Sequence, residues 1–548
     1  MGIFVYGWIK QDARLAGLNT LRYSVWISRG AGLCLGIDGL LLVLPILRNI
    51  VSVFRPLLAA VVPLDENLWT HRQVAYSLLF WSIVHTTSHY VNMFNVELTQ
   101  IRKETAWAIM YTQPGGFTGH MMLLIMFLMY TTAHRRIRKQ AFETFLYTHH
   151  LFILFLLCLY THATGCFVRG ALPSQPVRCL GYNSWTWTIW GGIAYVIERI
   201  IREVRPGCIS FHILRDDDER RNFVQVRGRR RTALIRVLMH HSGVIELRFS
   251  KPSLRYKAGQ WLFINVPEIS RWQWHPFTIS SAPDDAFVAV HIRQVGDWTK
   301  DLGRILGCNQ RFAVQPSFSK SSEKRDLHSF VDIGSLLIGK DCLPSIRVDG
   351  PYGAPAEDVF KFEVALLIGT GIGVTPFASI LKNIWHMQQQ GKLGFLRRLH
   401  FIWCTREVEH FGWFQSLLEN LEQTDPVFLR INMYLTQPVD QDTLANIAVH
   451  ESSAAASDPL THLKSRTRFG RPNFPSILTT LARQVETGEY LPGREASVKT
   501  NVGVFYCGPN ELAKTLKVAC VDASTPAVRF AFRKEHFVRL SADTLYYA

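Results

Sequence analysis

Apolar positions divide the chain into two parts of different character. Residues 30–205 are strongly apolar, whereas the remainder alternates between apolar and polar positions like a soluble α/β protein. About 20 apolar residues cross a bilayer as a helix. The pattern predicts five such helices, at residues 29–48, 74–94, 115–133, 145–164 and 185–202. We therefore expect a multi-pass membrane protein, with an all-α transmembrane bundle before its soluble domains.

The basic connection 134–140 predicts the orientation of these helices, because positively charged loops stay on the cytosolic side. The segment 199–206 is then also cytosolic, and the loops 95–114 and 163–184 face the outside. Residues 1–28 do not fit, since their basic residues would lie outside. Their apolar opening, MGIFVYGWIK, is too short to span, and we expect it to be the end of a truncated first helix.

Charge and cysteine content exclude some functions. The formal net charge is +17 over 548 residues, but Lys and Arg are spread out and often border apolar runs. Membrane-flanking loops and a phosphate-rich cofactor explain this distribution better than nucleic-acid binding, so no nucleic-acid partner is expected. The ten cysteines include no CxxC pair and no metal-type spacing, which argues against a disulfide framework or a zinc site.

Histidines recur at matched spacings in the second and fourth predicted helices. His71 and His85 are 14 residues apart, roughly 21 Å along a helix, and lie on nearly one face. His149 and His162 are 13 residues apart, roughly 20 Å, but point roughly 140° apart on a straight helix, so a bend is required. Both helices should run from inside to outside. We therefore expect two stacked histidine pairs that ligate two b-type haems.

A structural role is the alternative for such histidines, because polar side chains can form hydrogen bonds between membrane helices. We expect this role for His120 and His150. For the other four, the two matched pairs at matched depths favour metal binding.

Alternating strands and turns predict a small antiparallel barrel in the soluble part. It includes WQWHPFTISSAP (272–283) and FVAVHIRQVGDWT (287–299). Phe277 can cover a flavin ring, the hydroxyl of Thr278 can hydrogen-bond its N5 edge, and Arg293 can neutralise a pyrophosphate. Taken alone, HPFT could equally be an ordinary strand with a proline at a sheet edge.

A buried strand with a glycine-rich turn, VALLIGTGIGVTPF (364–377), predicts a nucleotide site. The helix that starts near Thr375 presents backbone N–H groups that can hold a pyrophosphate. A second strand and turn, VFYCGP (504–509), places Cys507 where a nicotinamide can approach, although a small core residue is the alternative.

Arg406 and Arg471 follow other apolar segments of this region. Either can bind a 2′-phosphate through two parallel hydrogen bonds, which would favour NADPH over NADH. Each can also be an ordinary solvated arginine.

Taken together, these motifs resemble those of the NADPH oxidase family, in particular the fungal type without EF-hands. The resemblance covers roughly residues 10–537 and rests on THHLF with its distal histidine, HPFT, HIRQVGDWT, DGPYGAPAEDVF, GTGIGVTPFASILK, GRPNF, CGPN and FRKEHF. No EF-hand loop is found, since RDDDERR (215–221) lacks the required spacing and glycine.

The resemblance implies a fold of several domains, the last two of them ferredoxin-reductase-like. They are a ferric-reductase-like di-haem transmembrane domain with a truncated first span (1–205), a charged connector (206–233), an FAD-binding antiparallel β-barrel (234–355), an α/β NADPH-binding domain (356–537) and an atypical tail (538–548).

It also implies roles for individual residues. His71 with His149 would bind the inner haem, and His85 with His162 the outer haem. The FAD site would consist of His275, Pro276, Phe277, Thr278 and Arg293, with Phe537 covering the flavin. The NADPH site would consist of Gly369, Gly371, Gly373, Thr375, Pro376, Arg406, Arg471, Cys507, Gly508 and Pro509.

Arg29 and His89 would lie beside the outer haem. Iron with two histidine ligands has no open position, so O2 would take its electron at the haem edge, where a cation stabilises the developing superoxide. The alternative for Arg29 is a partner of a haem propionate or a lipid headgroup.

The implied activity is transmembrane electron transfer from cytosolic NADPH, through FAD and two b-type haems, to O2. Superoxide would be released on the far side of the plasma membrane or an endomembrane. Expected regulators are a Rac-type GTPase, a cytosolic activator and a small membrane subunit. A ferric-chelate reductase is the alternative enzyme, and a haem-poor membrane scaffold is the alternative of another class.

Overall fold

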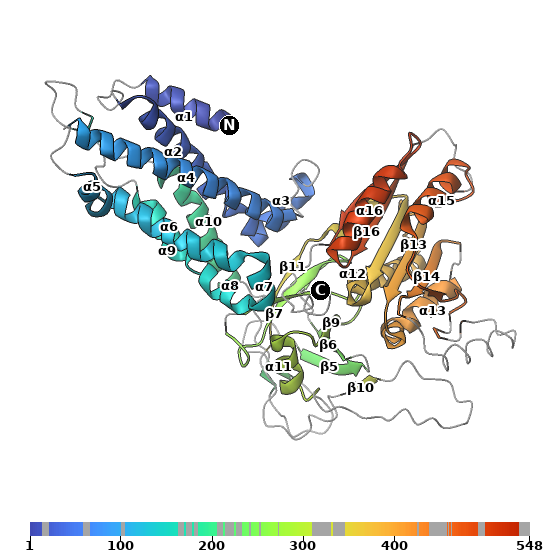
Figure 1. Cartoon of the computed structure of the whole chain (residues 1–548). Helices are drawn as coiled ribbons and strands as arrows, with labels where there is room; N and C mark the ends of the chain where they lie inside the picture. The colour runs from blue at the N-terminus through green and yellow to red at the C-terminus, as the bar shows by residue number, and fades with distance from the viewer. Residues whose placement is uncertain are drawn as a thin grey trace. The chain divides into compact units, whose positions relative to one another are not determined.

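The structure is a computed structural model. It describes residues 1–13, 21–58, 66–99, 105–162, 169–170, 178–179, 185–204, 212–213, 224–225, 233–240, 243–250, 254–271, 273–308, 330–332, 346–424, 427–437, 458, 460–461, 463–491 and 499–535. These residues form two compact units, within residues 1–204 and 205–539 (Figure 1). Most of the predicted connector 206–233, the tail 538–548 and Phe537 lie outside the described residues.

The N-terminal unit is built from helices. They are α1 (Gly2–Asp12), α2 (Tyr23–Leu41), η2 (Leu44–Ile46), α3 (Arg48–Leu58), α4 (Asn67–Leu98), α5 (Ala106–Thr112), α6 (Pro114–Ala133), α7 (Arg135–Gln140), α8 (Phe142–His149), α9 (Phe152–His162) and α10 (Trp185–Val204). A two-stranded ladder, β1 (Arg169–Gly170) with β2 (Arg178–Cys179), precedes α10.

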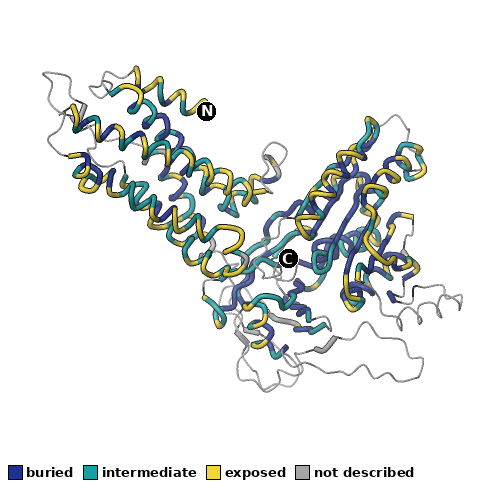
Figure 2. The backbone as a smooth tube through the Cα atoms, in the orientation of Figure 1, coloured by how far each residue is buried: buried dark blue, intermediate teal, exposed yellow. Residues whose placement is uncertain are grey.

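Three helical stretches among the described residues are long and apolar enough to cross a membrane: Tyr23–Ile46, Pro114–Ala133 and Phe142–His162. They correspond to three of the five predicted spans. The other two predicted spans are helical, in α4 (32 residues) and α10 (20 residues), and are long enough to cross a membrane but less apolar. Large apolar side chains such as Phe80, Phe127 and Leu157 are exposed on the bundle, as expected for a lipid-facing surface. Figure 2 shows that exposed positions recur along the helices of this unit.

The apolar opening of the chain forms α1, an 11-residue helix that packs against α2. Two glycines allow the close approach, since a Cβ on Gly7 would lie 2.9 Å from the Cα of Gly30. Phe4 also stacks on Trp81 of α4, with ring centroids 5.0 Å apart. The segment is therefore held by specific packing on the bundle.

The fourth predicted span is divided between α8 and α9. At the junction, the N–H of Leu151 donates to the carbonyl of Thr148 at 3.1 Å, and the N–H of Ile153 donates to that of His150 at 3.2 Å. These i to i+3 bonds wind the chain more tightly than an α-helix. They interrupt the α-helix between His149 and His162, where the sequence spacing requires a bend.

The first half of the second unit contains two antiparallel sheets. It carries the residues for which the sequence predicts a flavin site, and we call it the flavin half. One sheet has the order β10-β5-β6-β9 and the other β11-β7-β8. The strands are β5 (Ala233–His240), β6 (Val244–Ser250), β7 (Trp261–Asn265), β8 (His275–Thr278), β9 (Val288–Arg293), β10 (Phe330–Asp332) and β11 (Arg347–Tyr352), with a separate ladder of β3 (His212–Ile213) and β4 (Val224–Gln225) and the helix α11 (Asp297–Ile305).

The closed barrel predicted for this half is not observed among the described residues. A single bridge, between Ile279 and Val290, links the two sheets where the chain leaves β8. One apolar core includes side chains of both sheets, Leu247 and Leu262 among them. The sheets therefore pack together without a continuous hydrogen-bonded ladder around the core.

The second half of the second unit, which we call the nucleotide half after the site that its sequence predicts, contains a parallel sheet with the order β15-β14-β13-β12-β16-β17. Its strands are β12 (Val364–Thr370), β13 (Arg398–Thr405), β14 (Leu429–Leu435), β15 (Arg468–Phe469), β16 (Thr500–Cys507) and β17 (Val528–Lys534). The helices are α12 (Thr375–Gln389), α13 (Gln415–Thr424), α15 (Phe474–Glu486) and α16 (Asn510–Asp522), with 3-10 turns η5 (Pro355–Lys361), η6 (Gly371–Val374) and η7 (Val408–Trp413). Separate apolar cores join α12 and α13, and α15 and α16, to the sheet. This is the predicted α/β domain.

One face of α12 joins the flavin and nucleotide halves. The hydroxyl of Ser379 donates to the carbonyl of Ser281 at 2.6 Å, and both residues are buried. One and two turns further on, Lys382 and His386 contact the carboxylate of Asp285 at 2.8 and 3.0 Å. A buried hydrogen bond and a charge cluster thus fix this helix to the flavin half.

We expect Ser379→Ala to lower the free energy of unfolding of the second unit by about 1–3 kcal/mol, because the buried carbonyl of Ser281 loses its donor. Urea unfolding of the purified chain, followed by tryptophan fluorescence, measures the loss. Ser476→Ala, at an exposed position of α15, is the matched control. Equal midpoints for the two variants would contradict the importance of this contact.

Candidate functional site

The four histidines predicted as metal ligands form two facing pairs. The ring centroids of His71 and His149 are 6.2 Å apart, and those of His85 and His162 are also 6.2 Å apart. An imidazole nitrogen lies roughly 2 Å from the metal that it binds, so two rings on one metal have centroids about 6 Å apart. Each pair therefore has the separation that one metal ion between two imidazoles requires.

Hydrogen bonds fix the orientation of three of these rings. The Nδ1–H groups of His71 and His85 donate to the carbonyls of Leu42 and Ser28, each at 2.9 Å. The Nδ1 of His162 lies 2.9 Å from the hydroxyl of Thr118. Since a carbonyl can only accept, Nδ1 carries the proton in His71 and His85, and Nε2 is left as the metal-binding atom.

The same direction holds for His162. The hydroxyl of Thr118 donates its own proton to the carbonyl of Pro114 at 2.6 Å, so it accepts from Nδ1–H of His162. Nδ1 of His149 is buried and has no hydrogen-bond partner in the described part of the chain. One ring of the His71–His149 pair is thus held less firmly than the others.

Glycines leave space around the two pairs. A Cβ on Gly32 would lie 3.2 Å from the ring of His85, and one on Gly119 would lie 3.2 Å from the ring of His162. Gly36 is buried, yet a Cβ there would meet no atom within 4 Å. It lies in α2 between Ser28 and Leu42, and so between the levels of the two pairs. The residues present therefore fit two bis-histidine haem sites.

The two histidines predicted to have a structural role differ from each other. The Nδ1–H of His120 donates to the carbonyl of Gly116 at 2.7 Å, so its Nε2 accepts from the hydroxyl of Tyr90 at 2.8 Å and links α6 to α4 as predicted. His150 is exposed, and its Nδ1–H donates to the carbonyl of Leu146 in its own helix at 2.7 Å. The predicted interhelical bond of His150 is not observed among the described residues, since its side chain is exposed and its Nδ1–H is used within its own helix.

His89 and Arg29 lie at the level of the His85–His162 pair. The ring centroids of His89 and His85 are 4.4 Å apart. Arg29 follows Ser28, whose carbonyl holds His85, and its side chain is half-buried. The two predicted residues of the oxygen site are therefore both close to this pair in the fold.

The predicted flavin residues lie on β8 and at the end of β9. His275 stacks on Trp298 with ring centroids 4.1 Å apart, and Phe277 contacts the same indole at 6.1 Å. Pro276 is between them, and Thr278 is buried. Burial lowers the pKa of His275 to about 4, so its ring is uncharged at neutral pH.

Arg293, predicted to bind the flavin pyrophosphate, lies near the nucleotide half. Its Nη2 is 3.9 Å from Oε1 of Glu407, and both side chains are about two-fifths exposed, at 39% and 45%. Such an exposed pair contributes little stability, so a stronger anion can replace the carboxylate.

The two predicted nucleotide motifs meet at the carboxyl ends of the neighbouring strands β12 and β16. A Cβ on Gly373 would lie 2.5 Å from the carbonyl oxygen of Cys507, and one on Gly508 would lie 1.9 Å from Oγ1 of Thr370. Only glycine permits these approaches. Gly371 has a positive φ of 53°, and its carbonyl accepts from Nε1 of Trp403 at 3.2 Å.

Further predicted residues follow at this edge of the sheet. Gly369 precedes the turn, Thr375 and Pro376 begin α12, and Pro509 precedes α16. Arg406 and Arg471 come after the ends of β13 and β15 and are exposed. The carboxyl edge of a parallel α/β sheet is where such folds bind nucleotides.

Burial raises the pKa of the Cys507 thiol well above its ordinary value, and the nearby carboxylate of Glu535 raises it further. That carboxylate accepts from the N–H of Ala356 at 2.6 Å. Cys507 is therefore a neutral thiol at the end of β16, able to shape a binding site but not to act as a thiolate.

Three family models match the chain. They are the "Ferric reductase like transmembrane component" at residues 35–160, the "FAD-binding domain" at 229–356 and the "Ferric reductase NAD binding domain" at 362–521. Together they match the membrane, flavin and nucleotide parts in the order found here.

Proteins of similar length resemble the chain along almost all of it. NADPH oxidase 1 of Mus musculus is 32% identical over 98% of this chain and 91% of its own length. A superoxide-generating NADPH oxidase heavy chain of Dictyostelium discoideum is 32% identical over 97% and 94%. The chain belongs to the NADPH oxidase family. Human NADPH oxidase 3, at 29% identity over 93% and 91%, is a further relative.

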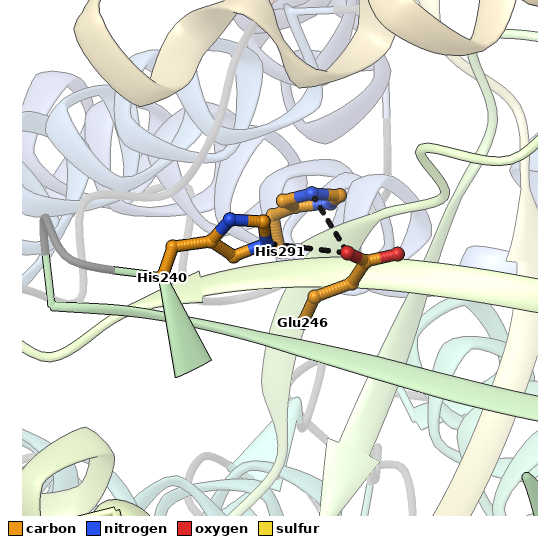
Figure 3. A group of neighbouring side chains, drawn as sticks. All are labelled: His240, Glu246 and His291. Atoms are coloured by element: carbon orange, nitrogen blue, oxygen red, sulfur yellow. Dashed lines mark hydrogen bonds and ion pairs between the residues drawn. The ribbon is translucent and has the colours of Figure 1, made fainter. Parts of the chain in front are cut away.

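Several residues of this NADPH oxidase family member were missed by the sequence reasoning. Carbonyl acceptors such as that of Ser28 have no sequence signal, because every residue carries a carbonyl. Trp298 lies in the GDWT motif, which could have drawn attention to it. The buried group of His240, Glu246 and His291 comes from three strands and depends on their register (Figure 3).

We expect Cys507 of the native chain to react with iodoacetamide at least roughly tenfold more slowly at pH 7 than after denaturation, because its raised pKa keeps the thiolate scarce. Mass spectrometry of the peptide that contains Cys507 measures the rate. A native rate equal to the denatured rate would show an accessible, ionised thiol instead.

Proposed function

We propose that the chain moves electrons across a membrane, from NADPH through FAD and two b-type haems to O2, and releases superoxide on the far side. Membership of the NADPH oxidase family supports the reaction. The observation that carries the proposal is the presence of two facing imidazole pairs with equal centroid distances of 6.2 Å. When bound, FAD accepts hydride from NADPH, and the haems carry its electrons singly to O2.

The four histidines hold the haems in this proposal. His71 and His149 are the ligands of the inner haem, and His85 and His162 those of the outer haem. The carbonyl and hydroxyl partners of Nδ1 keep Nε2 directed towards the partner ring. An iron held by both histidines of the outer pair would have no open position, so O2 would be reduced beside the pair and not on the metal.

Arg29 and His89 receive O2 at that side. His89 lies against His85, and Arg29 is attached to the segment of α2 that holds the same ring. Negative charge develops as O2 becomes superoxide, and a cationic or hydrogen-bond-donating side chain within reach stabilises it. Their contribution is therefore to the reduction of O2 and not to haem retention.

The reductase unit binds both nucleotides. We assign FAD to His275, Pro276, Phe277, Thr278 and Arg293, where Glu407 holds the guanidinium of Arg293 until a pyrophosphate replaces it. Cys507 would hold the nicotinamide end of the cofactor, with its neutral thiol as part of the site. The remaining NADPH residues are Gly369, Gly371, Gly373, Thr375, Pro376, Arg406, Arg471, Gly508 and Pro509.

Orientation, domain division and regulation belong to the same proposal. The flavin and nucleotide halves are cytosolic, and the basic helix α7 (Arg135–Gln140) supports this side for the loop that contains it. The five-part division expected from the motifs is retained. The regulators, proposed from the family resemblance alone, are a Rac-type GTPase, a cytosolic activator and a small membrane subunit.

Ferric-chelate reduction is the second candidate, because two of the matching family models are described as ferric reductase components. The relatives that match the full length are NADPH oxidases and favour oxygen as the acceptor. Membranes given NADPH distinguish the two: dye reduction that superoxide dismutase abolishes supports the oxidase. Iron(III) reduction without oxygen uptake would support the reductase.

We expect His162→Leu to lose one of two haems, because the outer pair then lacks an axial ligand. The haem-to-protein ratio and the reduced b-type spectrum measure the loss. His150→Leu is the matched control on the same span, since its side chain is exposed and bonds only within its helix. Two bis-imidazole haems in purified His162→Leu protein would refute the assignment.

His89→Leu should keep both haems yet lower superoxide output by roughly tenfold or more, because the outer site loses a group that stabilises charge on O2. Superoxide-dismutase-sensitive cytochrome c reduction gives the output, and haem reduction by NADPH gives the supply of electrons. Loss of haem from this variant would count against a role limited to O2.

A further inference from the structure

A buried group of three side chains connects neighbouring strands of the flavin half. Nε2 of His240 lies 3.2 Å from Oε2 of Glu246, and Nε2 of His291 lies 3.7 Å from the same oxygen (Figure 3). Their side chains are only 12%, 6% and 4% exposed, in the order His240, Glu246, His291. The strand register explains the meeting, since Glu246 of β6 is paired directly with His291 of β9 and with Leu238 of β5.

The hydrogen bonds of His291 determine which of its nitrogens faces the carboxylate with a lone pair. The hydroxyl of Ser280 donates to the carbonyl of Ala289 at 3.1 Å and lies 2.8 Å from Nδ1 of His291. With the hydroxyl proton on that carbonyl, Ser280 accepts from Nδ1–H of His291. Nε2, which is buried and has no hydrogen-bond partner in the described part of the chain, then directs its lone pair towards Glu246.

Two electron-rich atoms facing each other in a buried site require a positive charge between them. A proton shared along a hydrogen bond does not supply it, because the 3.7 Å between Nε2 of His291 and Oε2 of Glu246 is too long for one. Arg248 does not supply it either, because its Nε binds the other carboxylate oxygen, Oε1, at 2.5 Å. That contact orients the carboxylate and leaves Oε2 directed towards the two histidines.

We propose that His240, Glu246 and His291 bind one divalent metal ion, with Zn2+ as the best match. Metal–ligand distances of roughly 2.0–2.2 Å place the ligand atoms of a tetrahedral zinc ion roughly 3.3 Å apart. The observed separations of 3.2 and 3.7 Å are close to this value, and all three ligand atoms lie within 4.8 Å of one another. A water molecule completes the tetrahedron.

The hydrogen bonds around the ligands are those of a metal site. A ligating imidazole usually donates its other N–H to an oxygen, as His291 does to Ser280, and a ligating carboxylate is itself hydrogen-bonded, as Glu246 is by Arg248. The spacing of the cysteines, which argues against a zinc site built from thiolates, does not bear on this ligand set. Two imidazoles and one carboxylate are an equally suitable ligand set.

The position of the site suggests what the metal does. It ties together β5, β6 and β9, and His291 also packs against Phe414 of the nucleotide half, with ring centroids 4.8 Å apart. Arg248, which binds Glu246, and Lys382 of α12 both lie over the ring of Phe287, at 5.0 and 5.2 Å from its centroid. A bound ion therefore stabilises the flavin sheet where the nucleotide half rests on it. This inference does not depend on the proposed electron acceptor.

Zinc binding by the full-length purified chain tests the proposal. Bound metal is removed with a chelator, and the protein is then incubated with zinc chloride and desalted. Elemental mass spectrometry gives the zinc and iron content per chain. We expect about one retained zinc ion per chain, and at least roughly tenfold weaker binding in His291→Gln and Glu246→Gln. His386→Gln, a control histidine on α12 that binds Asp285 outside the group, should retain zinc.

X-ray absorption at the zinc edge separates this site from incidental binding, and haem iron does not interfere with it. Two imidazoles and only nitrogen and oxygen ligands, at about 2 Å, are expected. Sulfur ligands, no retained zinc in the native chain, or equal zinc in native and His291→Gln protein would each overturn the proposal. If Glu246→Gln fails to fold, His240→Gln at the most exposed ligand takes its place.

Discussion

Imidazole rings buried in pairs between membrane helices impose the main constraint on the N-terminal unit. Ionisable groups in this environment are costly, so each ring needs an acceptor for its N–H and a partner for its other nitrogen. Helix α2 supplies two of the acceptors as main-chain carbonyls, at Ser28 and Leu42, to rings on α4. Because Ser28 serves His85 and Leu42 serves His71, the two helices must run antiparallel and in one register. The packing of the bundle follows from where the histidines stand.

The same polar residues lower the mean hydropathy of part of the membrane domain. Helix α4 has 32 residues, but its inward face carries side chains such as His71, His85 and Asn92, which lower its average. Asn92 donates to the hydroxyl of Ser28 at 3.2 Å, so it too serves the interior. Helix α4, which contains His71 and His85, is therefore less apolar than helix α6.

Sequence spacing was sufficient for features that depend on helix geometry or strand order. It placed the histidines in pairs and required the interruption that follows His149. It also predicted a strand and turn that end at Cys507, and the structure brings this turn to the glycine turn of β12, because the carboxyl ends of neighbouring parallel strands share one edge. Spacing could not reveal the main-chain acceptors, the stacking of His275 on Trp298, or the open connection between the flavin sheets. Those depend on the register of strands and helices far apart in the chain.

Helix α12 has a mechanical consequence. It begins at Thr375, beside the glycine turn, and Ser379, Lys382 and His386 follow at intervals of three or four residues along a single face towards the flavin half. One helix thus extends from the turn that would bind a pyrophosphate to the half that would bind the flavin. Its contacts would therefore fix the distance between the nicotinamide and flavin sites, which hydride transfer depends on, before either dinucleotide binds.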